Sequence, residues 1–150
     1  MEWIEALRGA VVGIDTAPFI YLIEENPAYL PLIRPFFEAV DQGAFSLITS
    51  VLTLTEVLIH PMRHGDHELA GQYRQILLHA GQVKTVPVSE AIAEEAARLR
   101  AQYSRRTPDA IQLATALRMD ASSFLTNDSG LPRLADLKVL VLSQFAPPRS

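Results

Sequence analysis

Four acidic residues lie at or within two turns of the ends of predicted elements: Asp15, Glu56, Asp109 and Asp128. Carboxylates gathered at one place repel one another, so such a group needs a compensating cation and raises the pKa of at least one member. Oxygen-only ligands suit Mg²⁺ or Mn²⁺, which keep waters and bridge to substrate phosphates. Such an ion can supply a hydroxide nucleophile and stabilise the oxygen that leaves a phosphodiester. The four residues are therefore candidate ligands of a catalytic metal ion.

Asp15 is the strongest of these candidates. It directly follows the short apolar run Val11–Ile14, which is typical of a buried strand in a parallel sheet. Its carboxylate is expected at the carboxyl edge of that sheet, where open α/β folds bind their ligands. A carboxylate at the end of a buried strand is costly unless it is paired.

Each of the other three acids also has a purely structural explanation. Asp109 stands in the first turn of a predicted helix, where the helix dipole favours an acid. Asp128 lies in an Asn-Asp-Ser-Gly segment and is a typical turn residue. Glu56 lies in a helix that is apolar nearly all round, so it is either on a solvent-facing strip or a buried ligand. Jointly, at matching ends of successive elements, the four are far more specific than any one of them.

The elements that must position these acids alternate along the chain. Hydrophobic patterns predict strands over residues 11–14, 45–49, 83–88, 124–126 and 139–142. Predicted helices cover residues 1–8 (a short turn or helix), 18–25, 30–40, 51–59, 68–80, 90–103 and 107–119. Ser50, Ser89 and Thr107 are the predicted N-caps of the three helices that follow them directly. The alternation predicts one three-layer α/β/α domain over residues 1–150, with a central, mostly parallel sheet of four to five strands, an N-terminal extension (1–10) and a frayed tail (146–150).

Composition narrows the class of protein. The chain has 150 residues, of which 49% are hydrophobic and 20% charged, and it has no cysteine. We expect a cytoplasmic protein, because the start carries acids where a signal peptide carries bases, and no apolar run approaches the roughly 20 residues that span a bilayer. The formal net charge of -4 is not typical of a nucleic-acid-binding protein and counts against an RNA substrate.

Together these segments resemble the PIN-domain superfamily, and within it the VapC-type toxin ribonucleases. The resemblance extends from residue 11 to about residue 142, and its motifs are residues 13–16, 53–58, 107–116 and 124–128. The acidic quartet of the family corresponds to Asp15, Glu56, Asp109 and Asp128, with Thr16, Thr126 and Asn127 as supporting residues. The resemblance implies Mg²⁺- or Mn²⁺-dependent endonucleolytic cleavage of single-stranded RNA by a dimer that a cognate antitoxin silences. The N-terminal extension departs from the family, which usually begins almost at once with the first strand.

Two further features concern partners. Arg105 and Arg106 precede Asp109 and either hold RNA phosphates or belong to a solvated loop. The early helices are rich in apolar residues, which predicts a homodimer and an antitoxin groove unless these side chains fill the core. The residues concerned are Phe19, Ile23, Leu30, Phe36, Phe37, Leu58 and Met62.

Other functions have weaker support in the sequence. No glycine-rich phosphate loop occurs, and Ala17 stands where a haloacid-dehalogenase-like phosphatase has a second acid. His60, His64 and His67 have loosely metal-like spacing, but Pro61 and Gly65 break the helix that would align them. No histidine is spaced to activate Ser50 or Ser129 as a hydrolase nucleophile. The alternative that stays open is a non-catalytic α/β module that binds a partner protein or RNA.

Overall fold

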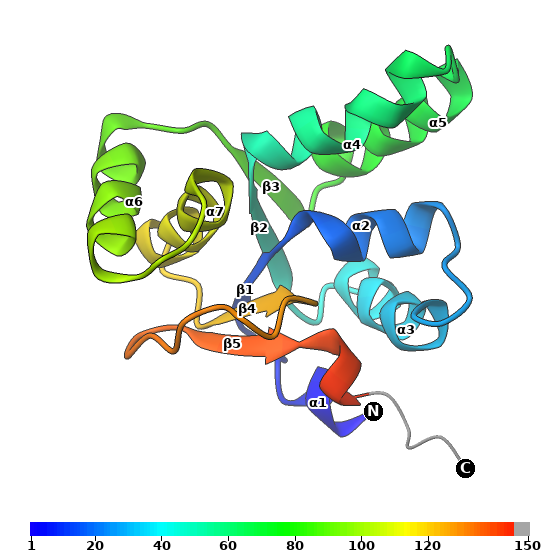
Figure 1. The fold of residues 1–150 in the computed structure, drawn as a ribbon. Coiled ribbons are helices and arrows are strands. Elements are labelled where there is room, and N and C mark those ends of the chain that lie inside the picture. Colours follow the sequence, from blue (N-terminus) through cyan, green and yellow to red (C-terminus); the bar gives the residue numbers. More distant parts are fainter. Residues whose placement is uncertain (146–150) are drawn as a thin grey trace.

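A five-stranded parallel sheet forms the centre of the molecule in the computed structural model, which describes residues 1–145 (Figure 1). Its strands run in the order β3-β2-β1-β4-β5, and all four neighbouring pairs are parallel. Their bounds are β1 Val11–Ile14, β2 Ser46–Ser50, β3 Val83–Val86, β4 Ser123–Thr126 and β5 Lys138–Val141. The predicted α/β/α architecture is confirmed. The predicted frayed tail, 146–150, lies outside the described residues.

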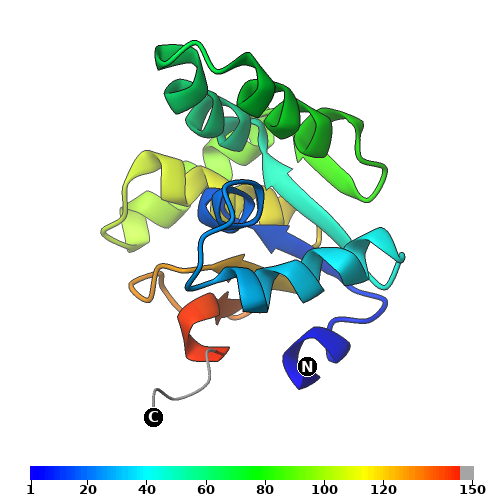
Figure 2. The same ribbon diagram turned by 90° about the vertical axis from the view of Figure 1, so that its right-hand side faces the viewer.

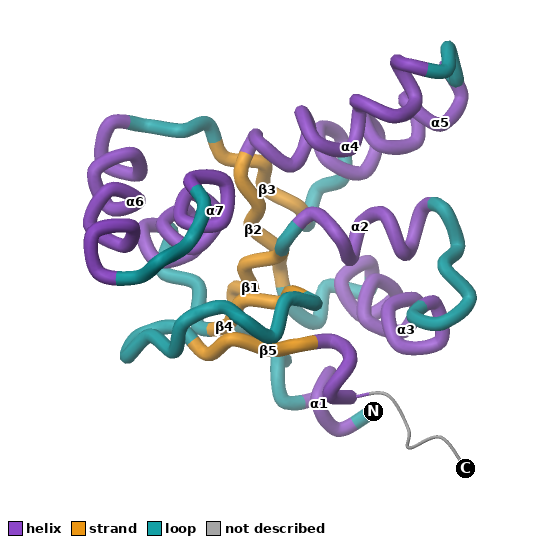
Figure 3. Tube along the Cα trace, in the orientation of Figure 1, coloured by secondary structure: helices purple, strands orange, loops and turns teal. Residues whose placement is uncertain are grey.

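Helices cover both faces of this sheet. Their bounds are α1 Glu2–Glu5, α2 Thr16–Ile23, α3 Leu30–Asp41, α4 Val51–Arg63, α5 His67–Arg74, α6 Glu90–Gln102 and α7 Thr107–Arg118, with a π-helical turn, η1 (Gln75–His79), after α5 and a 3-10 turn, η2 (Leu142–Phe145), after β5. Helices α6 and α7 lie together on one side of the strands, and α2 and α3 lie on the other (Figures 1 and 2). Helices α4 and α5 pack against each other and project beyond the sheet (Figure 3).

Alternation along the strands divides the core into two clusters, because successive strand residues point to opposite faces. Val12 and Ile14 of β1 join the cluster under α2 and α3, whereas Phe124 of β4 joins the cluster under α6 and α7. Gly13 lies between them on β1, where a Cβ atom would come within 2.8 Å of Ala116 and 2.9 Å of Phe124. Glycine is therefore needed at this position so that α7 can lie close against β1.

The N-terminal extension is part of the core rather than a loose arm. Trp3 stacks between Phe36 of α3 and Phe145 of η2, with ring centroids 5.7 Å and 4.6 Å away. Ile4 and Leu7 are buried in the same cluster as Phe36. The extension therefore joins the two ends of the described chain to α3, a role that the sequence left open for Trp3.

Several predicted helix boundaries were wrong, among them the start of α2, which is Thr16 rather than residue 18. Helix α4 continues through Pro61 to Arg63, although Pro61 has no N–H to donate to the Val57 carbonyl one turn earlier. The predicted helix 68–80 is α5 followed by the π-helical turn η1. Thr107 is the first residue of α7 rather than its N-cap, and Arg106 is the N-cap without a side-chain capping bond. The caps Ser50 and Ser89 are confirmed, since their hydroxyls accept from the Leu52 and Ile92 amides.

The apolar residues that suggested a dimer mostly fill the core. Phe19, Phe36 and Phe37 are buried, so they give no surplus apolar surface. Met62 is 60% exposed, and its neighbour Ile59 is 48% exposed. The apolar surface of these helices is thus confined to the outer part of α4. Within residues 1–145, no helix is both long and apolar enough to cross a membrane.

Candidate metal and nuclease site

The carboxyl ends of β1 and β4 meet at the point where the strand order reverses direction. From β1 the chain builds β2 and β3 on one side, and β4 and β5 are added on the other. A reversal of this kind is where open parallel sheets bind ligands. Asp15 immediately follows β1, and Asp128 lies two residues beyond β4. The predicted position of both acids at this edge is therefore realised in the fold.

Asp15 is held by hydrogen bonds from the first residue of α2 and the last residue of β4. Its Oδ1 accepts from the Thr16 amide at 2.9 Å, which makes Asp15 the N-cap of α2. Its Oδ2 accepts from the Thr126 hydroxyl, at the end of β4, at 2.8 Å. Burial raises the pKa of the Asp15 carboxyl, and repulsion from Asp109 and Asp128 raises it further against these two hydrogen bonds.

Glu56 lies on the exposed strip of α4 and yet belongs to the same group of charges. Partial burial of its carboxyl raises its pKa first, and repulsion from Asp15 and then Asp109 adds to the rise. The Thr16 hydroxyl and the charge of Arg106 act in the opposite direction. Of the two placements left open for Glu56, the solvent-facing strip is the observed one. The pKa values of the Asp15 and Glu56 carboxyls are thus both raised, as expected for acids that lie close to one another.

A buried hydrogen-bond network lies next to Asp15 and joins the elements around it. The Gln112 amide oxygen accepts from the Ser50 N–H at 3.2 Å, and its Nε2 donates to Thr53 Oγ1 at 2.8 Å. Thr53 Oγ1 lies 2.8 Å from Thr49 Oγ1, which itself donates to the Ile14 carbonyl at 2.8 Å. A hydroxyl has one proton, so Thr53 is the donor to Thr49. The network therefore connects α7 to the start of α4 and to the end of β1.

Thr16 adds the last hydroxyl to this network. Its Oγ1 lies 3.3 Å from Thr53 Oγ1, and both side chains are buried. Thr16 was a candidate site residue from the sequence, whereas Gln112, Thr53 and Thr49 were not. One signal was available for Gln112, because it is a lone amide among alanines, a leucine and a threonine in the middle of α7, all of them buried.

Asp109 and Asp128 are joined by Arg105. One guanidinium nitrogen, Nη2, donates to Asp109 Oδ2 at 3.0 Å and also to Asp128 Oδ2. The Arg105 side chain is 25% exposed, and those of Asp109 and Asp128 are 19% and 43% exposed. Asp128 also closes its own turn, since its Oδ1 accepts from the Gly130 amide at 2.8 Å. Arg105, a candidate for binding RNA, thus contacts the acids in this structure.

The remaining candidates occupy two different environments. Thr126 contacts the acids directly, because its hydroxyl binds Asp15 and also accepts from the Asp128 amide at 3.1 Å. Asn127 turns elsewhere: its Nδ2 donates to the Tyr21 hydroxyl at 3.1 Å and its Oδ1 accepts from the Ser143 amide at 2.9 Å. Asn127 therefore fixes the segment after β4 rather than facing the acids. Arg106 is exposed beside Glu56.

The chemistry of this group fits a hard divalent cation. Its donors are carboxylate oxygens, and Asp15 is close enough to Asp109 and Asp128 for their charges to raise its pKa. In residues 1–145, no three acidic, histidine or cysteine side chains lie close enough to hold one ion as they stand. Arg105 contacts the carboxylates of two of the four acids, which is the position that an ion between them would take.

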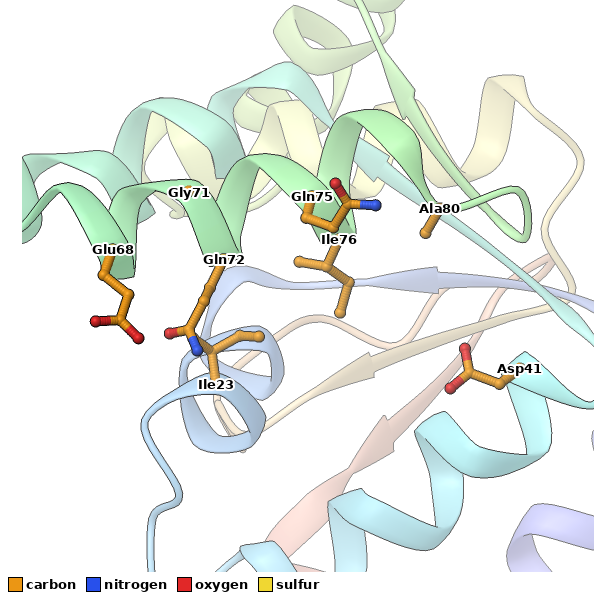
Figure 4. A pocket seen from close by; sticks show the side chains of 8 residues that line it. All are labelled: Ile23, Asp41, Glu68, Gly71, Gln72, Gln75, Ile76 and Ala80. Carbon is orange, nitrogen blue, oxygen red and sulfur yellow. The ribbon is translucent and has the colours of Figure 1, made fainter.

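A separate hollow is lined by none of these acids. It lies between α5 and η1 on one side and the ends of α2 and α3 on the other (Figure 4). Asp41 ends α3 just before β2 begins, so this hollow is at the amino edge of the sheet. Asp41 and Glu68 both line it and give acids remote from the candidate site. Asp41 is therefore a suitable control for the loss of one charge away from the candidate site.

Comparison with known proteins agrees with this architecture. The sequence model of the PIN domain matches residues 12–137. The chain belongs to the PIN domain family. A search by sequence among curated proteins finds no significant match.

Several solved structures share the PIN fold at low sequence identity. One is VapBC2 from Rickettsia felis bound to a DNA fragment from its promoter, with a TM-score of 0.68, 15% identity, and coverage of 87% of this chain and 98% of that one. A toxin-antitoxin complex from Klebsiella pneumoniae has a TM-score of 0.63 and 22% identity, and the match covers 89% of this chain and 98% of that one. VapC20 from Mycobacterium tuberculosis, a toxin that cleaves the sarcin-ricin loop, has a TM-score of 0.65 and 16% identity. The match covers 81% of this chain and 92% of that one.

Proposed function

We propose that this PIN-domain protein is an endoribonuclease that cleaves single-stranded RNA with Mg²⁺ or Mn²⁺, and that it is the toxin of a toxin-antitoxin pair. The observation that carries the proposal is the gathering of Asp15, Glu56, Asp109 and Asp128 at the reversal point of a PIN-family sheet. A divalent ion bound there supplies Lewis-acid activation of water and of the scissile phosphate.

The residues of this chain would divide the remaining work between them. Asp15, Asp109 and Asp128 would hold the ion, and Glu56 would orient water or complete the shell from its exposed position on α4. Thr16 and Thr126 would keep the Asp15 carboxylate in a fixed orientation, since both donate to it. Arg106, exposed beside Glu56, would attract the phosphates of the RNA.

Partners follow from the solved relatives and from the charge of the site. Two of the similar structures are a VapBC protein pair and a toxin-antitoxin complex. An antitoxin segment with a basic side chain would complement the acidic edge. The exposed Ile59 and Met62 on α4 are the surface that we assign to a homodimer. A cytoplasmic location fits an RNA substrate.

The decisive experiment incubates the purified protein with structured and unstructured RNAs in Mg²⁺, in Mn²⁺ and in chelator. We expect internal cleavage of the unstructured RNA in either ion and none in chelator. Asp15→Asn should remove the cleavage, whereas Asp41→Asn, at the opposite sheet edge, should retain it. Cleavage that survives in chelator or in Asp15→Asn would contradict the proposal.

The second candidate function is a non-catalytic module that binds a partner protein or RNA. The net charge of -4 favours it, because a nuclease that binds RNA is expected to be more basic. It differs in one measurable respect. A pure binding module would bind its partner equally well with a divalent ion and with chelator, and none of the four acids would be needed for binding.

A further inference from the structure

Arg105 sits where a cation would sit between two acids of the proposed metal site. A single nitrogen, Nη2, contacts both Asp109 Oδ2 and Asp128 Oδ2, and its companion Nη1 lies 3.5 Å from the Gly130 carbonyl. The backbone of Arg105 is also held in place, because Arg100 Nε donates to its carbonyl at 2.9 Å. The guanidinium therefore connects the start of α7 to the turn after β4.

The docked guanidinium is only partly satisfied. Its Nε is buried and has no hydrogen-bond partner among the described residues. A buried donor without a partner opposes the docked arrangement, because the same N–H would bind water if the side chain swung out. The turn is also tight: a Cβ atom on Gly130 would come within 3.2 Å of both Arg105 Nη1 and Asp128 Oδ1. Arg105 is thus held mainly by its two carboxylates.

We propose that Arg105 is an exchangeable internal counter-ion, which neutralises Asp109 and Asp128 in the metal-free protein and is released when a divalent cation binds these carboxylates. The inference rests on the proposed metal site. In the metal-free protein Arg105 then binds the two carboxylates rather than RNA, and it lowers the affinity of the site for metal by competing for them.

Exchange follows from the atoms that are shared. The two carboxylates that bind Nη2 are the same ones that an ion between Asp109 and Asp128 would need. Two cations at contact distance of the same oxygens would repel each other strongly at this partly buried edge. Each Mg²⁺ or Mn²⁺ ion that binds must therefore break the contacts of Arg105, and the free energy of those contacts is subtracted from metal binding.

The test is calorimetric titration of Mn²⁺ and Mg²⁺ into the wild type, Arg105→Gln, Arg105→Lys and Arg106→Gln. Arg106→Gln is the matched control, because it removes the same charge one residue away and its side chain has no carboxylate ion pair among the described residues. We expect Arg105→Gln to bind metal about 5-fold or more tightly than the wild type, the lower end of ordinary coupling between sites. Arg105→Lys should lie between them, and Arg106→Gln should stay within about 2-fold.

A second measurement follows the guanidinium itself. The Nε–Hε resonance of Arg105, assigned by its loss in Arg105→Lys, should shift as Mg²⁺ saturates the wild type. If the wild type binds metal but Arg105→Gln binds no tighter than Arg106→Gln, or if the resonance does not move at saturation, the inference is overturned. If the wild type and all variants fail to bind either ion, the proposed metal site itself is wrong.

Discussion

Two pairs of acids face the same sheet edge and are stabilised in opposite ways. Asp15 and Glu56 make no ion pair in the part of the chain that the structure describes, and the first accepts hydrogen bonds only from an amide and a hydroxyl. Asp109 and Asp128 share the Arg105 guanidinium. One half is organised by neutral donors and the other by a charge.

In the first pair, hydrogen bonds orient a carboxylate without neutralising it. In the second pair, an arginine neutralises the carboxylates. Neutral hydroxyls and an amide can fix a carboxylate in place but leave it strained by its neighbours, as the raised pKa of Asp15 indicates. Arg105 relieves the repulsion between Asp109 and Asp128 but occupies the carboxylates that we propose as metal ligands. The two halves should therefore respond differently to mutation, pH and metal.

The largest expected effect is on catalysis by the half without a cation. Asp15→Asn keeps the shape of the side chain but removes one charge from the proposed metal site. We expect the rate of RNA cleavage to fall at least ~100-fold, which is about 2.7 kcal/mol in the barrier. Single-turnover cleavage in Mn²⁺ measures this, and an unchanged rate would point to a contaminating nuclease.

The second effect concerns the network under Asp15. Gln112→Leu leaves the buried Ser50 N–H and the Thr53 hydroxyl each without the amide partner, so we expect unfolding free energy to fall by about 1–3 kcal/mol. Melting temperature should drop by about 2–4 °C for each kcal/mol. Thr115→Val is the control on the same helix, because the Thr115 hydroxyl bonds only to the Ile111 carbonyl of its own helix. Equal losses in both variants would show that the network has no special role.

The third effect is a gain in stability that depends on pH. The folded pKa of Asp15 lies above its ordinary value of 3.8, so the folded protein binds more protons than the unfolded chain between these values. Its contribution to stability is therefore largest at low pH and is lost as the pH rises through the folded pKa. In chelator, Asp15→Asn should match the wild type near pH 4 and exceed it at neutral pH by ~1 kcal/mol, or about 2–4 °C.

Thermal melts across this pH range decide the matter. If the stability of Asp15→Asn relative to the wild type falls as the pH rises toward neutral, the pKa of Asp15 is lowered in the folded protein rather than raised, and this explanation is wrong.

The smallest effect is expected in the half that Arg105 bridges. Asp128→Asn relieves repulsion but also removes one of the two carboxylates of Arg105, whose side chains stay partly exposed to solvent. We expect a change in unfolding free energy between about 0 and 1 kcal/mol, and a loss rather than a gain. Parallel melts of Asp15→Asn and Asp128→Asn in chelator test the contrast, and shifts of the same sign and size would remove it.

The fold was largely predictable because its strands are short apolar runs that end in turn or cap residues. Asp15 follows such a run directly, and Ser50 and Ser89 occupy cap positions that sequence alone identifies. Helix ends were harder to place. A proline near the C-terminus of α4 looks like a break, although the last turn of a helix can hold it.

The site was predictable as a set of acids but not as a set of contacts. The alternation of strands places Asp15 and Asp128 at one edge without any knowledge of side chains. Whether Arg105 reaches toward RNA or back to Asp109 and Asp128 depends on how the turn after β4 lies against the start of α7, which no local pattern encodes. Gln112 was missed because a buried amide is recognisable only when its partners across the core are known.

Whether the four acids bind one divalent ion together, as we propose, can be decided by one melting series. Wild type, Asp15→Asn, Glu56→Gln, Asp109→Asn and Asp128→Asn are compared in chelator and in Mn²⁺, with Asp41→Asn as the control acid from the hollow at the opposite sheet edge. At a metal concentration about 100 times the dissociation constant, binding stabilises the wild type by about 2.7 kcal/mol. We predict that Mn²⁺ raises the melting temperature of the wild type and of Asp41→Asn equally, and raises that of each site variant less. Full metal stabilisation in all four site variants would contradict the account.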